Sequence, residues 1–503
     1  MKRSGSVTVF TSLFLAVFLL VFQVLLQAVQ IAGGRVQVEA GVEEGLYSVF
    51  ACYDREMLEN YHIFMVDGSY GSNHWKLQKM YQTVKKRMEE SCEPGKSIID
   101  VCGDNLWKCS DISGSITAYT LLTDDNGAGF QSQAITYMKE TLGIQGIRIL
   151  LEQYEKQKNI WENQEETNAD LNQAMDAYET AKTKGEEEKN QTEQNDKENQ
   201  EEQEEITETE KHAEVPKDFV NPLEVIQELR KKGVLALVMP KGKTISQAGF
   251  EDADRLSKRT LEKGMGVPCG ASFQESTVEK LLFQAYMMEH LTNFFSKNSS
   301  SDTIQYQVEY VIGGKECDEE NLREVVKELL LLREAANMVY LLKSPVRQQE
   351  IHEMAWMICG ALGLPAIEGV VSLALQAAWA FGESIVDVRQ LLEGGNVPLI
   401  KTDGSWTVSI ENLARLTEVL EERRQQGQKG LTYEEYLSML LLAKKETVKV
   451  QRTMEIAEQV IRSMDGKNEF RLDYGVVYLQ TEMKVSIRGR MFTLERDYGY
   501  DMS

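Results

Sequence analysis

Two carboxylates in the second half of the chain have the spacing that acid–base chemistry needs. Glu383 and Asp387 are about one helical turn apart, so a helix would present both on one face. In that arrangement one group could act as general acid and the other as general base. The same spacing fits ion pairing to Arg389 or Lys401 at the edge of a core, and we favour this interpretation. We therefore predict no catalytic residue, and a protein that is not an enzyme.

The other motifs that resemble ligand sites each lack a required residue. Gly242-Lys243-Thr244 matches the end of a phosphate-binding loop, but Leu237 stands where the first glycine of that loop belongs. The run Asp124-Asp125-Asn126-Gly127 resembles the start of a calcium loop, yet no glutamate closes that loop, and a hairpin turn is favoured. The five histidines form no paired metal motif. The sequence therefore predicts no cofactor and no metal.

Three of the seven cysteines are close together in the sequence, namely Cys92, Cys102 and Cys109. Nine and six residues separate them, so the cluster lacks the close pairs that bind zinc. In a chain that lies outside the cytoplasm, a disulfide within this cluster is expected, and its pairing stays open. Because seven is an odd number, at least one thiol stays unpaired within the chain. Cys359 lies in an apolar run and is predicted to be buried and inert.

The N-terminal segment determines where the protein resides. No charged side chain occurs between Arg3 and Arg35, and residues 7–31 are almost wholly apolar. As a helix rising about 1.5 Å per residue, this run reaches about 37 Å, enough to cross a hydrocarbon core of about 30 Å. We therefore predict a transmembrane helix over residues 6–34 in a single-pass protein of the cell membrane. The basic leader 1–5 and the acidic residues beyond Arg35 predict a cytoplasmic N-terminus and an extracytoplasmic remainder.

A cleaved secretory signal is the alternative to a permanent anchor. Its apolar core is about 7 to 15 residues long and ends at a small-x-small site, so the longer run here favours the anchor. The leader Met1-Lys2-Arg3-Ser4-Gly5 also has the layout of a type IV pilin leader, which a peptidase cuts after the glycine, here between Gly5 and Ser6. Phe10 occupies the position that is acidic in pilins, and whether the leader is cleaved stays open.

Amide side chains form a stripe inside the predicted membrane helix. Gln23, Gln27 and Gln30 fall at i, i+4 and i+7, which places them on one face. Amide hydrogen bonds between helices in lipid contribute about 0.6 to 2 kcal/mol each. The stripe predicts an interaction seam for a second copy of the helix or for a membrane assembly platform. In the alternative interpretation, Gln27 and Gln30 lie at the level of the lipid headgroups.

The net charge of −24 is concentrated in one segment. Residues 185–214 contain 13 acidic residues and 3 lysines, with almost no apolar side chain to bury. This composition predicts a disordered acidic insert over residues 183–215, between ectodomain parts 35–182 and 216–503. The sequence has no basic stripe that could neutralise phosphates, so nucleic acid is excluded as a partner.

Hydrophobic periodicity predicts an α+β fold, in which one N-terminal transmembrane helix continues into a mainly helical ectodomain with antiparallel strands. The apolar face of the first helix continues from Val42 to Met57, with a bend allowed at Gly33-Gly34. A long helix followed by a strand at 61–66 is a pilin-like start. Further strands are predicted at 112–123, 234–239, 304–312, 470–478 and 483–487, and helices at 131–184, 276–296, 318–342, 347–392 and 432–464.

Residues 354–382 form a second long apolar segment, in which Glu368 is the only charged residue. A second membrane span would return the C-terminus to the cytoplasm. Pro365 and the central Glu368 oppose that interpretation, because a carboxylate in the middle of a span costs about 2.5 to 3.5 kcal/mol on insertion scales. We favour a pair of helices buried in a large core.

Several ordered blocks of the sequence resemble an uncharacterised family of Gram-positive bacteria, a domain of unknown function. The resemblance covers roughly residues 5–145 and 216–495, without the acidic insert, and its blocks are 5–10, 48–56, 67–71, 309–315, 333–337, 379–389, 397–401 and 433–437. It implies a single-pass surface protein that accompanies tight-adherence (Tad/Flp) pilus genes, similar at its N-terminus to TadE/TadG-like pseudopilins. It implies no established activity and no catalytic residue.

These observations predict a non-enzymatic, membrane-anchored, pseudopilin-like component or accessory of a tight-adherence pilus or related secretion apparatus. The predicted partners are the membrane, proteins of a pilus-type assembly platform, and a second copy of the chain through the membrane helix. The first alternative is a surface ligand-binding module or an enzyme that acts on the cell wall. The second alternative is a structural surface protein without a link to pili.

Overall fold

The chain forms two compact units, and each unit collects segments that are distant in the sequence. The computed structural model describes residues 4–92, 107–161, 173, 176–184, 220–249, 255–266, 276–296, 303–422 and 429–500. Unit 1 comprises Met1–Gly143, Glu251–Tyr286 and Glu446–Ser503, and unit 2 comprises Ile144–Phe250 and Met287–Lys445. The predicted acidic insert 183–215 lies outside the described residues except at its first two positions, and it stays a prediction.

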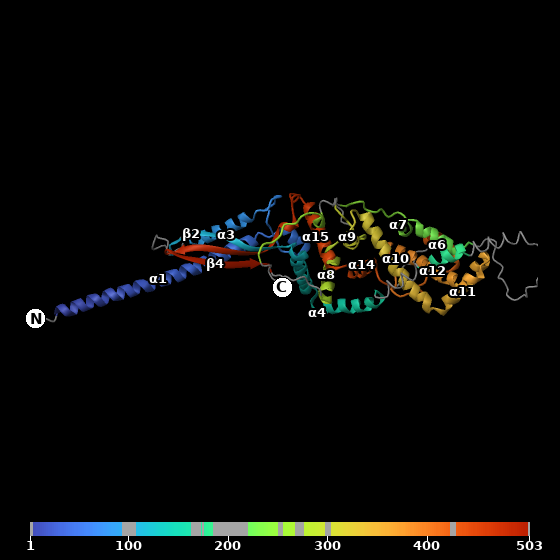
Figure 1. Cartoon of the computed structure of the whole chain (residues 1–503), viewed down its shortest axis with the longest axis horizontal. Coiled ribbons are helices and arrows are strands. Elements are labelled where there is room, and N and C mark those ends of the chain that lie inside the picture. The colour runs from blue at the N-terminus through green and yellow to red at the C-terminus, as the bar shows by residue number, and fades with distance from the viewer. Residues whose placement is uncertain are drawn as a thin grey trace, which may run out of the picture. The chain divides into compact units, whose positions relative to one another are not determined.

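Unit 1 combines a long helix with a small antiparallel sheet (Figure 1). Two further helices, α4 (Asp124–Trp161) and α8 (Thr277–His290), begin in unit 1 and end in unit 2. The elements of unit 1 are α1 (Ser4–Phe50), α2 (Arg55–Tyr61), β1 (Val66–Asp67), α3 (Leu77–Cys92), β2 (Cys109–Leu121), η2 (Leu256–Lys258), α15 (Glu446–Arg462), η5 (Leu472–Tyr474), β3 (Gly475–Ile487) and β4 (Arg490–Gly499).

Strand β3 is the centre of the sheet, because every other strand pairs with it in antiparallel fashion. β2 runs along β3 from Cys109, opposite Ile487, to Leu121, opposite Val476. β4 follows β3 through a two-residue turn at Arg488 and Gly489, whose φ angles of 50° and 80° explain the glycine. The strands predicted at 470–478 and 483–487 are parts of the single strand β3, except that the first of them includes the short helix η5 (Leu472–Tyr474).

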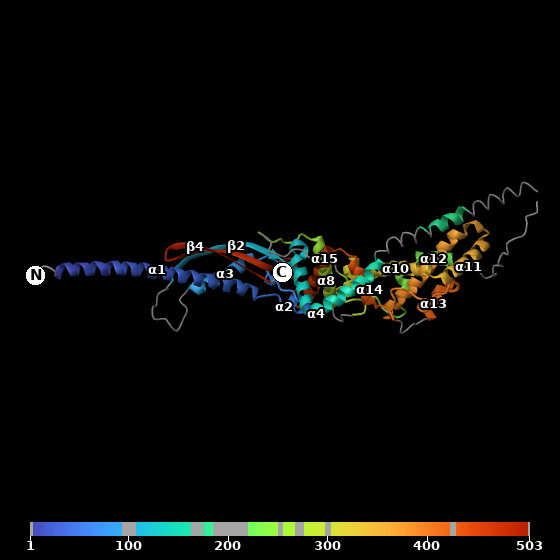
Figure 2. The same ribbon diagram turned by 90° about the horizontal axis from the view of Figure 1, so that it is seen from below.

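Helix α1 lies against α3 and the sheet along its C-terminal half (Figure 2). Val38, Val42, Leu46 and Val49 are buried there at helical spacing. Arg496 of β4 forms ion pairs of 3.1 Å with two carboxylates on α1, those of Glu39 and Glu43. One unbroken helix therefore carries both an apolar N-terminal half and a face that belongs to the core of unit 1.

Glycines make the contact between α1 and α3 possible. A Cβ atom at position 45 would lie 2.8 Å from the Cα atom of Val84, and one at position 41 would lie 2.7 Å from the Cβ atom of Ser91. Side chains at these positions would hold the two helices apart. The bend allowed at Gly33-Gly34 does not occur, since α1 continues through both residues.

Unit 2 is a bundle of helices, and most residues of its long helix α12 (Glu368–Leu392) are buried. The charged and apolar side chains of α12 pack against α10, α11 and the loop that follows α12. The elements of unit 2 are α6 (Pro222–Lys231), α7 (Val234–Val238), α9 (Gln307–Gly313), α10 (Asp318–Lys343), α11 (Pro345–Leu362), η3 (Pro365–Ile367), α12 (Glu368–Leu392), η4 (Glu411–Arg415), α13 (Leu416–Glu422) and α14 (Tyr433–Leu442).

The predicted α+β fold is confirmed, but two predicted strands are wrong. Residues 234–239 contain helix α7, and the segment 304–312 contains helix α9. In the segment 304–312, the alternation of polar and apolar residues predicted a strand with one face exposed to solvent, yet the polar residues Gln307 and Glu309 are buried as well. Because polar and apolar residues of this segment are both buried, their alternation does not indicate a strand with one buried and one exposed face. The strand predicted at 61–66 is reduced to β1, Val66–Asp67.

Substituting Gly45 by valine tests the contact between α1 and α3. We expect Gly45→Val to lower the free energy of unfolding by about 1 to 3 kcal/mol, because the new side chain meets the backbone of Val84. Gly369→Val in α12 is the matched control, since nothing lies within 4 Å of a Cβ atom there, and its effect should stay within about 0.5 kcal/mol. Urea denaturation of the purified full chain measures both. Equal effects of the two substitutions would contradict the close packing.

Candidate functional site

The N-terminal half of α1 is an apolar helix with no protein around it. The segment Val7–Phe50 is long and apolar enough to cross a membrane, and its most apolar stretch has no buried residue. Large side chains such as Phe10 and Val29 are 68% and 67% exposed. Gln23 and Gln27 of the predicted seam are exposed, and Gln30 is half-buried. The side chains of Gly5 and Ser6, the candidate cleavage position, lie outside the described residues.

The seam points along the same side of α1 as the face that packs in unit 1. Advancing from Gln30 in steps of about 3.6 residues reaches Gly34, Gly41 and Gly45, which contact the sheet and α3. The exposed amides of the seam therefore lie on the same side of α1 as the face that packs in unit 1, but in the N-terminal half of the helix. A second helix bound along the seam would lie on the side of α1 that faces α3.

The second apolar segment is buried in protein. Pro365–Leu392 also has the length and composition of a membrane span, but most of its apolar stretch lies inside unit 2. Residues from Ala374 to Ala380 of α12 are buried, as are Met354, Ile358 and Cys359 of α11. This burial agrees with the predicted pair of core helices. It also confirms that Cys359 is buried, where desolvation raises the pKa of its thiol to about 11.

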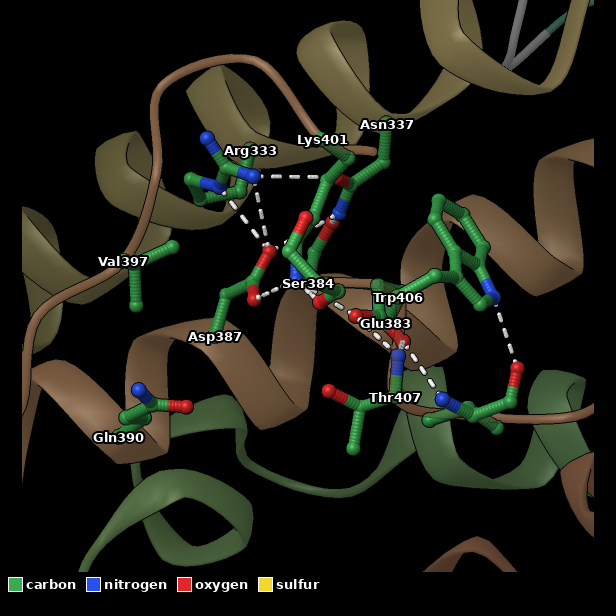
Figure 3. Close-up of polar contacts among 12 residues, drawn as sticks. Arg333, Asn337, Glu383, Ser384, Asp387, Gln390, Val397, Lys401, Trp406 and Thr407 are labelled. Atoms are coloured by element: carbon green, nitrogen blue, oxygen red, sulfur yellow. Dashed lines mark hydrogen bonds and ion pairs between the residues drawn. The ribbon is translucent and has the colours of Figure 1, made fainter. Parts of the chain in front are cut away.

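Four buried charges form one network at the centre of unit 2 (Figure 3). Lys401 binds both carboxylates of the predicted pair, with Nζ lying 2.6 Å from Glu383 Oε1 and 2.6 Å from Asp387 Oδ1. Arg333 of α10 binds the other oxygen of Asp387, at 3.0 Å. The structural interpretation of the pair is therefore correct for Lys401, whereas Arg389 contacts Glu393 instead.

Neutral groups satisfy the remaining hydrogen bonds of the network. The backbone amides of Thr407 and Val408 donate to Glu383 at 2.9 and 2.8 Å, and Asn337 donates to Asp387 at 3.2 Å. Burial raises the pKa of Glu383, while Lys401 opposes that shift. Every carboxylate oxygen of the pair is occupied by a donor from the protein. The pair thus fastens the loop after α12 to α10 and α12, and leaves no oxygen free for a substrate.

Arg333 and Asn337 are the members of this network that sequence analysis did not single out as a site. They lie one turn apart in α10, within the block 333–337 that carried the family resemblance. Arg333 directly follows four leucines at 329–332, and an arginine buried beside them needs a buried anion, because an unpaired buried charge is very costly. That requirement was the available signal.

Removing Lys401 should strongly destabilise unit 2. In Lys401→Met two buried carboxylates lose their shared cation, and breaking such a pair costs about 3 to 5 kcal/mol. Lys327→Met is the matched control, because Lys327 pairs with Glu324 on α10 with 48% of its side chain exposed, and its loss should cost less than about 1 kcal/mol. Urea denaturation measures both variants. A cost for Lys401→Met as small as that of the control would show that the network does not stabilise the fold.

Glu309 is a second buried carboxylate, and only one of its oxygens is satisfied. Oε1 accepts hydrogen bonds from the backbone amide of Phe294 and the hydroxyl of Tyr433, both at 2.9 Å. Oε2 is buried and has no hydrogen-bond partner among the residues that the structure describes. Burial, aided by the nearby Asp318, raises the pKa of Glu309 to about 7.

The stability of the protein should therefore fall as the pH rises toward neutrality. The folded chain holds the proton of Glu309 more tightly than the unfolded chain, so the stabilisation is complete below a pH of about 4.5 and lost as the pH rises to about 7. The expected loss from this group is about 3 kcal/mol. Urea titrations between these pH values should show a shallower dependence for Glu309→Gln. The exposed Glu320 of α10 supplies the control, Glu320→Gln, which should follow the parent curve. Parallel curves for all three proteins would contradict the assignment.

Two of the three clustered cysteines meet in unit 1. Cys92, at the end of α3, is part of the core of unit 1, Cys109, at the start of β2, packs against that core, and Cys102 lies outside the described residues. Neither sulfur is in a disulfide in this structure.

A cavity of about 640 Å³ in unit 1 contains the run that resembled a calcium loop. Asp125, Asn126 and Gly127 all have positive φ angles, but they form no hairpin, because the run leads from β2 into α4. Asp124 accepts hydrogen bonds from the backbone amides of Leu121 and Gly264, so its carboxylate fastens a turn. Among the residues that the structure describes, no group of three metal-ligating side chains is present.

Comparison with known proteins identifies a family and nothing finer. No curated protein and no solved structure matches the chain. The profile of a family of unknown function, DUF5702, matches residues 208–487, which is more than half of the 503 residues. The matched range includes all members of the buried charge network, α15 and the central strand β3. The chain therefore belongs to this family of unknown function.

Proposed function

We propose that this protein is a single-pass, membrane-anchored, non-enzymatic component or accessory of a tight-adherence pilus or a related secretion apparatus. The observation that carries the proposal is the division of α1 into a bare apolar half and a half packed on a small antiparallel sheet. A pilin-like protein needs both halves, one to lie in the membrane and one to complete its domain. The basic leader and the acidic residues of the packed half favour a cytoplasmic N-terminus.

The exposed amides of α1 are the surface through which such a protein would join an assembly. In lipid, Gln23 and Gln27 have no water to bind and gain from a partner helix. Because the seam continues the packed face of α1, a partner along it would lie on the side of the helix that faces α3. The partner is a helix of the assembly platform or a second copy of α1.

A surface ligand-binding module is the second candidate function. It is favoured by the cavity of about 640 Å³ in unit 1, which combines acidic residues such as Asp125 and Glu262 with apolar ones such as Leu256 and Met454. A volume of that size suits a small ligand. The occupied carboxylates of Glu383 and Asp387 support a binding role over an enzymatic one.

A triple substitution in the seam tests the proposed assembly. Replacing Gln23, Gln27 and Gln30 by leucine keeps the helix apolar but removes its interhelical hydrogen bonds. We expect membrane association to persist, while cross-linking of the full chain to other membrane proteins or to itself falls several-fold. The control replaces Val21, Ala28 and Val29, on the opposite side of the helix, by leucine and should cross-link like the parent. If the seam variant also cross-links like the parent, the amides have no role in assembly.

A further inference from the structure

The contact between Cys92 and Cys109 lies where α1 leaves unit 1. Ser91, next to Cys92, exchanges hydrogen bonds with Gln37 of α1 at 3.0 and 3.1 Å. Ile487 is the register partner of Cys109 in the sheet, and its side chain covers Gly34 of α1. Both cysteines thus belong to a group of residues on one side of the first packed turn of α1, which we call the collar: Ser91, Cys92, Trp107, Cys109 and Ile487.

The two sulfurs differ in their exposure to solvent and in the direction of their pKa shifts. Cys92 is 5% exposed and lies in the apolar core, whereas Cys109 is half-buried. The hydrogen bond from Cys92 lowers the pKa of Cys109, and the same bond, with burial, raises the pKa of Cys92. Cys109 is therefore the more accessible sulfur of the two, and Cys92 is the protected sulfur beside it.

We propose that Cys92 and Cys109 form a disulfide that links α3 to β2 within the collar. This inference deepens the proposed function, since it rests on an extracytoplasmic location for unit 1. The thiolate of Cys109 attacks the disulfide of a thiol–disulfide oxidoreductase and releases one of its sulfurs as a thiolate. Cys92 then loses its proton and attacks the Cys109 sulfur, which releases the second oxidoreductase sulfur. The chain loses two electrons and two protons, and the oxidoreductase becomes a dithiol.

The bond would fasten the end of α3 to the start of β2 at the level of Gly34 and Gln37. α3 is the helix that α1 packs against, and β2 borders the central strand of the sheet. A covalent collar therefore prevents these elements from separating when the membrane half of α1 is pulled or tilted. It also constrains the 16 residues between the two cysteines in the unfolded chain.

Tryptic peptide mapping distinguishes all three pairings in the cluster. Cleavage after Arg87, Lys96, Lys108 and Lys139 gives peptides 88–96, 97–108 and 109–139, each with one of the three cysteines. Cells that express the full chain are treated with N-ethylmaleimide before lysis, and the protein is digested without reductant. We expect peptide 88–96 linked to peptide 109–139, with Cys102 alkylated on peptide 97–108. A link that involves Cys102 overturns the proposal.

External protease on intact cells separates this inference from the proposed function. If unit 1 is accessible to protease and all three cysteines are alkylated, the disulfide proposal fails while the topology stands. If unit 1 is protected, the proposed topology fails, and the pairing is then tested on the purified full chain with glutathione disulfide. Formation of the 88–96 to 109–139 link supports the assigned pair, and its absence overturns it.

Variants connect the bond to the stability of unit 1. Reduction should lower the thermal midpoint of the oxidised full chain by roughly 6 to 12 °C, as expected for a loop of this length. Cys109→Ser should show the lower midpoint with or without reductant. Cys52→Ser, at an exposed cysteine of the same unit, should behave like the parent. A midpoint that does not respond to reduction in the parent would contradict a role for the bond in the collar.

Discussion

The structure of unit 1 depends on one helix that must satisfy two different surroundings. Up to residue 29, α1 exposes apolar side chains on every side, and from Gly34 onward it presents one narrow face to the core. That face is narrow because Gly41 and Gly45 let the backbone of α3 approach closely. α3, β3 and β4 are arranged around this face, and Arg496 adds ion pairs to the acidic side of the helix. The rest of unit 1 therefore depends on the contact between α1 and α3.

Unit 2 owes its arrangement to buried charge instead. Arg333, Glu383, Asp387 and Lys401 carry two positive and two negative charges in a region without water contact, and each charge finds an opposite partner. A buried pair of this kind adds little net stability compared with apolar residues, but the loss of one member is costly. The network therefore selects one position for the loop that carries Lys401 and Thr407. Glu309 shows the opposite case, in which a half-satisfied carboxylate makes stability depend on pH.

The proposed role and the proposed disulfide meet on α1. The glutamine seam and the residues that contact the collar lie on consecutive turns of α1. A partner helix in the membrane and the disulfide in unit 1 would therefore both hold the same helix. Gln30 is half-buried and Gly34 is covered by Ile487, which places the transition between the two surroundings within about one helical turn.

The sequence alone determined the elements that have a long periodic pattern of apolar residues or a long unbroken apolar run. The apolar N-terminal helix, the helical segments that contain α10, α11, α12, α14 and α15, and most of strand β3 follow from long periodic patterns. Short segments were less well determined, because in α9 every side of the segment is buried and polar residues bind the protein. Only the tertiary structure decided which partners meet: Arg333 with Asp387, Cys92 with Cys109, and Gly45 with the backbone of Val84. These contacts join residues that are 17 to 54 positions apart in the sequence. Local sequence periodicity reports only on neighbours within a few turns of a helix or a few residues of a strand, so it cannot predict such contacts.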